Sequence, residues 1–506
     1  LLPSIYLEWL DGQKLKTSDL DSDQKNQANK HFESAELVAN RMLGSIKLIE
    51  SDPVVEASFR LANKAIMLQR QWFIGDEDSI LVWRPFQLAF ILLSLESLVN
   101  PSHPDRKTAD LLWFPTGGGK TESYLGLIAF LLFYRRYTYG EEGSGVAAIM
   151  RYTLRLLTVQ QFQRAASLIC ACEYLRLGNG VPKGIPKLSS QTPFSLGLWV
   201  GGDTTPNNFE IAKKALSVDT AHNRPDQLKY CPVHISRKLQ WIAQANTESI
   251  HAHCPDEDCL WHQSKAPLPV WTVDPDIYKT RPSLLIGTVD KFAQIARRAE
   301  TSSLFGLPNL NRKPDLIIQD ELHLISGPLG TLTGLYEVAI DELCSDDEGP
   351  AKVIASTATI RQASSQIKAL FNRDTCLFPP PIVDFDNSGF AVEDIEAPGR
   401  LYIGVTTAGR SAKFSLQAVA ASILQSAASS DITDEVRDDF WTLVTYFNSL
   451  RELGGALVLM QDDVTQSISE YAGRRGEEPR EVREPLELTS RVSSTEIKEI
   501  LDDLTI

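Results

Sequence analysis

The sequence contains a glycine-rich loop between two apolar segments, and few folds accommodate that combination. Residues 109–114 predict a buried strand, the loop Pro-Thr-Gly-Gly-Gly-Lys-Thr follows at residues 115–121, and an apolar helix comes next. Glycines let backbone N–H groups turn towards phosphate oxygens, and the N-terminus of the helix adds the positive end of its dipole. Strand, loop and helix in this order predict a P-loop nucleotide site.

Each residue of the loop has a predicted task. Lys120 would hold the β- and γ-phosphates of ATP, and the Thr121 hydroxyl would ligate Mg²⁺. The general P-loop pattern has a glycine where this chain has Phe114. The alternative, a chance Lys-Thr pair after a glycine-rich turn, does not account for the flanking strand and helix. The predicted nucleotide-binding residues of the loop are Thr116, Gly117, Gly118, Gly119, Lys120 and Thr121.

A second apolar run, residues 316–319, leads directly into Asp320 and Glu321. An apolar strand that ends in Asp-Glu is the arrangement that holds Mg²⁺ and prepares water in P-loop ATPases. Asp320 would hold Mg²⁺, Glu321 would orient and deprotonate the attacking water, and His323 would report the state of the γ-phosphate. The alternative is that Asp320 only caps a helix.

Short apolar runs alternate with longer helical patterns between residues 81 and 380. This alternation predicts an α/β domain whose parallel sheet is covered by helices on both faces. Residues 1–80 are polar with helical periodicity and indicate a helical accessory region. The runs predicted as strands are residues 109–114, 147–152, 195–200, 283–286, 315–319 and 352–355.

Two features interrupt the alternation. The polar stretch 205–275 holds three of the seven cysteines and five of the eight histidines, which indicates an inserted module. A proline-rich stretch at 378–381 marks a boundary. After it, residues 400–506 predict a partial second α/β domain, with strands at 401–405 and 456–459 and a helix at 415–425.

Within the insertion, cysteine and histidine occur in two close pairs. Cys231 and His234 have the spacing C-x₂-H, and Cys254 and Cys259 have the spacing C-x₄-C. Structural zinc is held by four sulfur or nitrogen ligands, usually as two close pairs on turns. The pattern predicts a zinc knuckle, with His262 or His253 as alternatives to His234. Unpaired surface residues in a long loop are the other interpretation.

Charge and hydropathy limit the partners. The formal net charge of −15 counts against a broad basic surface that coats nucleic acid, although a local basic groove is compatible with it. The longest apolar run, residues 124–134, is too short to cross a bilayer. We therefore expect no membrane partner and a cytoplasmic location.

The motifs, taken in order, resemble those of superfamily 2 DExH-type helicases. Seven elements in this order are far more specific than any one of them. The resemblance implies a RecA-like motor domain. The matching stretches are residues 84–87 for the adenine-reading motif, 115–121 for motif I, 152–161 for motif Ia, 201–202 for a glycine pair, 287–291 for motif Ib, 320–323 for motif II and 356–359 for motif III.

The resemblance also implies roles for individual residues. Gln87 would pair with adenine. Ser356, Thr357 and Thr359 would couple the state of ATP to the grip on the strand. The implied contacts to the nucleic-acid backbone are Thr153, Arg155, Gly201, Thr288 and Lys291.

Three stretches more narrowly resemble the helicase component of the DISARM anti-phage defence system: residues 285–292, 319–329 and 487–494. This resemblance implies a bacterial defence ATPase that works with a partner subunit. It also implies a DNA substrate that contains a single-stranded segment. No motif V or VI is recognisable after a motif IV-like stretch at 446–450. We interpret residues 473–476 as a solvated loop and expect the second motor domain to continue beyond Ile506.

The predicted function is an ATP-dependent DNA helicase or translocase. An ATP-gated DNA clamp or sensor that acts through a partner is the alternative, and an NTPase scaffold without nucleic acid is a third. Strand displacement would distinguish the first from the second, and ATP turnover indifferent to nucleic acid would indicate the third.

Overall fold

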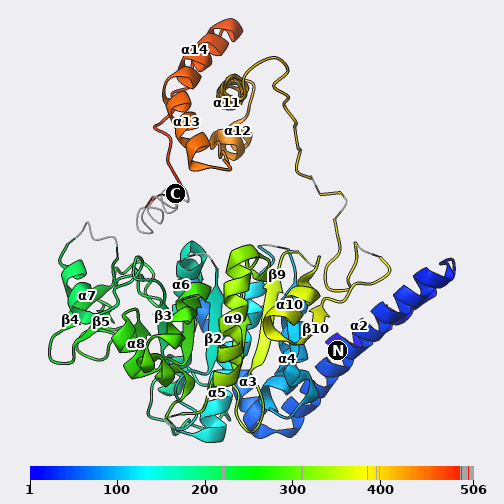
Figure 1. Ribbon diagram of the computed structural model, residues 1–506, viewed down its shortest axis with the longest axis vertical. Helices are drawn as coiled ribbons and strands as arrows, with labels where there is room; N and C mark the ends of the chain where they lie inside the picture. Colours follow the sequence, from blue (N-terminus) through cyan, green and yellow to red (C-terminus); the bar gives the residue numbers. More distant parts are fainter. Residues whose placement is uncertain are drawn as a thin grey trace. The chain divides into compact units, whose positions relative to one another are not determined.

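The structure is a computed structural model of the chain, and it has two compact units, residues 1–393 and 394–506 (Figure 1). Each unit is described by itself. The residues described are 1–115, 117–153, 155–218, 223–308, 311–359, 361–384, 386–394, 396–397, 399–489, 492 and 500, without the side chains of 155–157, 159 and 160.

A parallel sheet forms the centre of the first unit. In the described residues it has the strand order β10-β1-β9-β8-β2-β7-β3-β6, and its paired neighbours are all parallel. The predicted α/β class and the six predicted strands are confirmed. The two edge strands were not predicted, since one is very short and the other is half exposed. The strands are β1 (Thr108–Trp113), β2 (Ala148–Tyr152), β3 (Leu196–Trp199), β6 (Val270–Trp271), β7 (Leu284–Thr288), β8 (Leu316–Gln319), β9 (Lys352–Thr357) and β10 (Asp374–Phe378).

Helices cover both faces of this sheet, because successive strand side chains point to opposite sides. In β1, Leu112 joins one hydrophobic core and Leu111 joins the other. The first face is covered by α4 (Pro85–Val99), α5 (Lys120–Tyr139) and α6 (Arg155–Arg176), and the second by α8 (Asp274–Thr280), α9 (Gly327–Leu343) and α10 (Ala363–Phe371). Short 3₁₀ turns complete the unit: η1 (Pro104–Lys107), η2 (Val289–Ala296), η3 (Ala299–Phe305) and η4 (Leu322–Leu324).

The N-terminal helices form a further layer outside α4–α6. They are α1 (Leu2–Leu15), α2 (Ser22–Ser51) and α3 (Pro53–Ile74), and part of α2 projects from the body of the unit (Figure 1). Asp21 begins α2 with a capping box, and Asp52 caps α3. Apolar residues of all three helices belong to the same core as α5, so the predicted helical region packs on the domain that contains the parallel sheet.

A buried charge network ties this layer to the sheet. Arg41 of α2 donates two hydrogen bonds of 2.9 Å to Asp110 of β1, and Lys352 of β9 lies 2.9 Å from the same carboxylate. Asp110 is fully buried, which alone would raise its pKa, but Lys352 and Arg41 together lower it. The carboxylate therefore stays ionised in the core only because both cations accompany it.

Arg41→Met is expected to lower the free energy of unfolding by about 3 kcal/mol, because it leaves part of a buried charge uncompensated. Chemical denaturation measures the loss. The matched control is Arg60→Met, whose partner Glu56 is exposed, and there the change should stay below about 1 kcal/mol. Equal effects in the two variants would contradict the structural role of Arg41.

The insertion between β3 and β6 has its own small sheet. An antiparallel hairpin of β4 (Gln240–Gln244) and β5 (Ser249–His253) packs against α7 (Phe209–Leu216) through Phe209, Ala212 and Ile250. The predicted module is therefore a folded substructure at one edge of the parallel sheet.

The second unit is helical in its described residues. Its elements are α11 (Ala412–Ala427), α12 (Asp434–Trp441), α13 (Leu450–Gln461) and α14 (Asp463–Arg475). The predicted helix at 415–425 is confirmed within α11. The predicted strands are wrong: residues 401–405 are irregular, and residues 456–459 belong to α13, because a short apolar run has no period that separates strand from helix. Residues 473–475 form the last turn of α14 rather than a loop. In the described parts of both units, no helix is long and apolar enough to cross a membrane.

Candidate functional site

The glycine-rich loop joins the carboxyl end of β1 to the first residue of α5. Gly119 has a φ of 91°, in the left-handed region that favours glycine. A Cβ on Gly118 would lie 2.6 Å from the Phe114 ring. Phe114 itself stacks on Phe86 of α4 with ring centroids 3.8 Å apart, which explains why an aromatic residue stands where the general P-loop has glycine. Lys120 donates to the Phe114 carbonyl at 2.9 Å.

The first turn of α4 and the residue before it contact the same loop. Gln87 donates its amide to the Gly119 carbonyl at 2.8 Å and accepts from the Arg84 backbone at 2.9 Å. Arg84 also donates to the Gly118 carbonyl. The predicted adenine-reading amide therefore lies against the phosphate loop. Thr116, another predicted contact, lies outside the described residues.

Asp320 follows β8 and lies beside α5. Its Oδ1 accepts hydrogen bonds from the Glu321 backbone at 3.0 Å, from the Tyr124 hydroxyl at 3.4 Å and from the Ser356 hydroxyl. Asp320 is therefore more than a helix cap, because two of its donors, Tyr124 and Ser356, come from α5 and β9. Tyr124 was not predicted, although its position one turn after Lys120 could have indicated it.

Glu321 occupies a constrained position next to this carboxylate. Its φ of 48° is unusual for a residue with a side chain. Burial and the charge of Asp320 raise the pKa of Glu321, while Lys120 and His323 oppose that shift. A carboxylate with a raised pKa is a better acceptor for a proton from water. The phosphate loop and the acidic pair thus meet at one edge of the sheet.

Motif III lies on β9, between β1 and β8 in the sheet. Ser356 donates to Asp320, and the Thr357 hydroxyl lies 3.3 Å from Nδ1 of His323. The Thr359 backbone donates to the Thr357 hydroxyl at 3.1 Å. Two of the predicted coupling residues, Ser356 and Thr357, therefore contact the acidic motif directly, and Thr359 contacts it through Thr357.

Threonine hydroxyls gather where β2, β7 and β3 end. Thr153 directly follows β2, and Thr288 is the last residue of β7. Tyr152 pairs with Thr288, so the ends of these two strands are neighbours. Beyond β3, the Gly201 carbonyl accepts the backbone N–H of Thr204 and Thr205 in a tight turn. All four hydroxyls are buried and have no hydrogen-bond partner in the described part of the chain. Thr204 and Thr205 were not predicted, although they follow the predicted glycine pair.

Lys291 makes contacts within the protein. Its side chain is buried, its ammonium lies 2.9 Å from Asp274 of α8, and Asn207 accepts from it at 3.2 Å. The predicted phosphate contact would require breaking this buried pair, and in this arrangement Lys291 holds η2 to α8. Arg155 begins α6, but its side chain lies outside those described.

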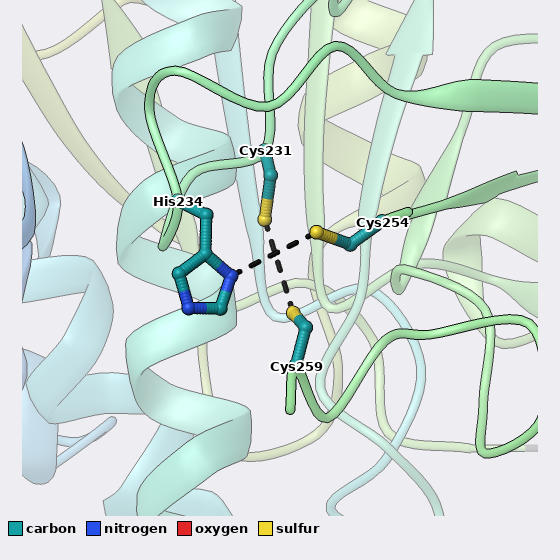
Figure 2. A group of neighbouring side chains, drawn as sticks. All are labelled: Cys231, His234, Cys254 and Cys259. Carbon is teal, nitrogen blue, oxygen red and sulfur yellow. Dashed lines mark hydrogen bonds between the residues drawn. The ribbon is translucent and has the colours of Figure 1, made fainter. Parts of the chain in front are cut away.

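The predicted zinc ligands converge in the insertion (Figure 2). The ligand atoms of Cys231, His234, Cys254 and Cys259 all lie within 4.8 Å of one another. Sγ of Cys231 is 3.9 Å from Sγ of Cys259, and Sγ of Cys254 is 3.7 Å from Nδ1 of His234. Tetrahedral zinc with Zn–S bonds of about 2.3 Å needs ligand separations of about 3.8 Å, so this donor set fits the ion.

The histidine ligand is His234 in this geometry. His262 instead contacts the Ser264 hydroxyl at 2.8 Å, and His253 lies on β5 outside the group. Hydrogen bonding from Cys231 lowers the pKa of the Cys259 thiol to about 5, which favours the thiolate that a metal needs. Cys231, Cys254 and Cys259 share a core with Cys170 of α6, and burial and the nearby Cys259 both raise the pKa of the Cys170 thiol, so the group lies beside the helix that carries most of motif Ia.

A parallel sheet with a phosphate loop after β1, an acidic pair after β8 and a Ser-Thr-Ala-Thr strand between them defines a RecA-like fold. The predicted resemblance to a DISARM protein is confirmed. The chain resembles the DISARM protein DrmA of Bacillus paralicheniformis: the two are 40% identical over 483 residues, which cover 84% of this chain and 42% of DrmA. The chain thus spans less than half the length of this relative. No protein-family model matches it.

Two solved helicase structures show weaker likeness. The DUF1998 helicase MrfA has a TM-score of 0.41 at 12% identity, over 82% of this chain and 42% of MrfA. The Mycobacterium smegmatis helicase Lhr, bound to single-stranded DNA and AMP-PNP, has a TM-score of 0.41 at 16% identity, over 86% of this chain and 40% of Lhr.

Proposed function

We propose that this chain is the ATP-hydrolysing part of a DNA helicase or translocase in an anti-phage defence system. One observation carries the proposal: the nucleotide-site residues and a row of unpartnered threonine hydroxyls lie at the same carboxyl edge of one sheet. In open α/β sheets, ligands bind outside the carboxyl ends of the strands. Two ligands at one edge can influence each other through the strands that both contact.

In this proposal the nucleotide is held by the phosphate loop. Lys120 leaves the Phe114 carbonyl and neutralises the β- and γ-phosphates, while Thr121 and Asp320 provide the ligand set for Mg²⁺. Glu321 accepts a proton from the attacking water, and His323 passes the change to Thr357. Gln87 gains an adenine partner beside the loop.

Nucleic acid is held at the neighbouring strand ends. The hydroxyls of Thr153, Thr204 and Thr288 provide donors for backbone phosphates, which suits a chain with a net charge of −15 because neutral donors need no basic surface. Gly201 has no side chain, so the turn after β3 leaves room for the nucleic-acid strand. DNA with a single-stranded segment is the proposed substrate.

The wider assignment rests on the likeness to DrmA. We propose that the chain works with a partner subunit in the cytoplasm and that residues 400–506 form part of a second motor domain. We also propose that residues 231–259 hold one structural zinc ion.

ATP turnover of the full chain, with and without a single-stranded DNA oligonucleotide at low salt, tests the function. We expect DNA to raise turnover several-fold and Thr288→Val to reduce that stimulation, because valine keeps the shape of threonine without the hydroxyl. The matched control is Thr375→Val. This hydroxyl on β10 is also buried without a partner in the described residues, but it lies near the amino ends of β10 and β1, away from the carboxyl ends of the strands.

The outcomes separate the candidate functions. Stimulated turnover with displacement of a labelled strand supports a helicase, and stimulated turnover with movement but no displacement supports a translocase. Tight ATP-dependent DNA binding without either indicates a clamp or sensor. Turnover that ignores DNA would overturn the proposal and favour a scaffold.

A further inference from the structure

Asp320 is surrounded by aromatic hydroxyl groups that the proposed chemistry does not use. Tyr124 of α5 and Tyr152 of β2 are both fully buried, in the hydrophobic core shared by α5 and the sheet. Tyr124 donates to Asp320 at 3.4 Å. Burial and the nearby charge of Asp320 raise the pKa of the second tyrosine, Tyr152, which indicates that its phenol lies close to the same carboxylate.

The strand register places Tyr152 next to Asp320. Arg151 pairs with Gln319 in β2 and β8, and the Asp320 backbone donates to the Arg151 carbonyl at 3.2 Å. The next residue of each strand, Tyr152 and Asp320, therefore continues the same pairing. Neighbouring side chains in register point to the same face of a sheet, so the phenol and the carboxylate share the face that α5 covers.

The Tyr152 hydroxyl has no hydrogen-bond partner within the described residues, although the residue is only 1% exposed. A buried hydroxyl without a partner costs free energy, and such groups mark places where a ligand or a rearrangement supplies the missing bond. Beside this hydroxyl lies the carboxylate that the proposed function assigns to Mg²⁺. Asp320 already receives its other hydrogen bonds on Oδ1.

Tyr152 also belongs to the proposed DNA edge. It immediately precedes Thr153 and pairs with Thr288 in β7. A small shift of the end of β2, caused by a phosphate bound at those threonines, would move the phenol relative to Asp320. The tyrosine thus lies between the two proposed ligand sites, since it is covalently bonded to Thr153 and in register with Asp320.

We propose that Tyr152 is a positioning residue that holds the Asp320 carboxylate for Mg²⁺ and transmits DNA occupancy of the β2 end to it. This inference rests on the proposed function. It assigns no role in proton transfer to the phenol. It requires that the hydroxyl, and not the ring, carries the effect.

The test is a Mg²⁺ titration of the binding of a fluorescent ATP analogue to the full chain, for wild type and Tyr152→Phe. Binding at equilibrium reports the metal site without requiring turnover. We expect the half-saturating Mg²⁺ concentration to rise about three- to tenfold, because the variant cannot form the hydrogen bond to the Asp320 carboxylate that the inference assigns to the hydroxyl when metal is bound. Single-stranded DNA should shift the wild-type midpoint and leave that of Tyr152→Phe in place.

Tyr134→Phe on α5 is the matched control, since this half-buried tyrosine lies away from the acidic pair; it should not change the midpoint. Melting temperature, measured without nucleotide, separates a folding defect from a metal effect. A Tyr152→Phe midpoint equal to that of wild type would overturn the inference. If wild type binds ATP with Mg²⁺ but never responds to DNA, the proposed function and the transmission role fail, while the positioning role is still judged by the midpoint.

Discussion

Glu321→Gln is expected to reduce ATP turnover about a hundredfold or more while ATP still binds. The amide has the shape of the carboxylate but does not accept the proton from the attacking water, and general base catalysis contributes about 10²–10⁴ in rate. Burial and Asp320 raise the pKa of Glu321, so wild-type turnover should also fall when the pH is lowered through that raised value, as the base becomes protonated. Steady-state turnover and equilibrium binding of a fluorescent ATP analogue measure the two parts.

The matched control is Glu342→Gln, an exposed glutamate in the last turn of α9, which should turn over ATP at the wild-type rate. A Glu321→Gln variant that keeps its turnover would show that another group prepares the water. Loss of ATP binding together with turnover would instead indicate a damaged fold and would contradict the local role.

Loss of the zinc ligands is expected to have the second large effect. Cys254→Ser should remove the single bound zinc ion, lower the melting temperature and expose residues 205–275 to proteolysis. Structural zinc provides folding free energy directly, about 10–16 kcal/mol of binding in small zinc peptides. Because the cysteines share a core with Cys170 of α6, we expect the loss of zinc to weaken the packing of α6 as well. Metal analysis, thermal melting and limited proteolysis measure these changes.

A pair of histidine variants tests the ligand assignment. His234→Ala should lose zinc as Cys254→Ser does, whereas His262→Ala should keep it, since His262 contacts Ser264 and lies outside the group. Zinc retained by His234→Ala and lost from His262→Ala would reverse the assignment. Protein that contains no zinc at all would leave the four residues as an ordinary buried cluster.

The clearest predictions from the sequence came from patterns that depend only on neighbouring residues. The phosphate loop needs only glycines, a lysine and a helix start, all within a few consecutive residues. The acidic pair follows its strand directly, and the strands of the central sheet are continuous apolar runs. The paired cysteines at 231 and 254–259 were also recognisable, because metal ligands occur in close pairs on turns. These predictions depended on spacing alone.

The errors arose where the signal depends on partners distant in the sequence. Residues 456–459 are apolar in either a strand or a helix, and only their surroundings in α13 decide between the two. The surroundings of Lys291, the last residue of motif Ib, were likewise not predictable from its place in the motif. The structure gives it Asp274, seventeen residues earlier in the sequence, and buries the pair.

The sequence by itself therefore determined the fold class, the glycine-rich loop, the acidic pair and the cysteine and histidine pairs of the insertion, since each depends on neighbouring residues. Only the tertiary structure decided what surrounds them. Tyr124 and Tyr152 meet Asp320, and Arg41 meets Asp110, across separations that no local pattern encodes. Strand order and register create those contacts, because a parallel sheet places residues side by side according to its pairing rather than their order in the chain.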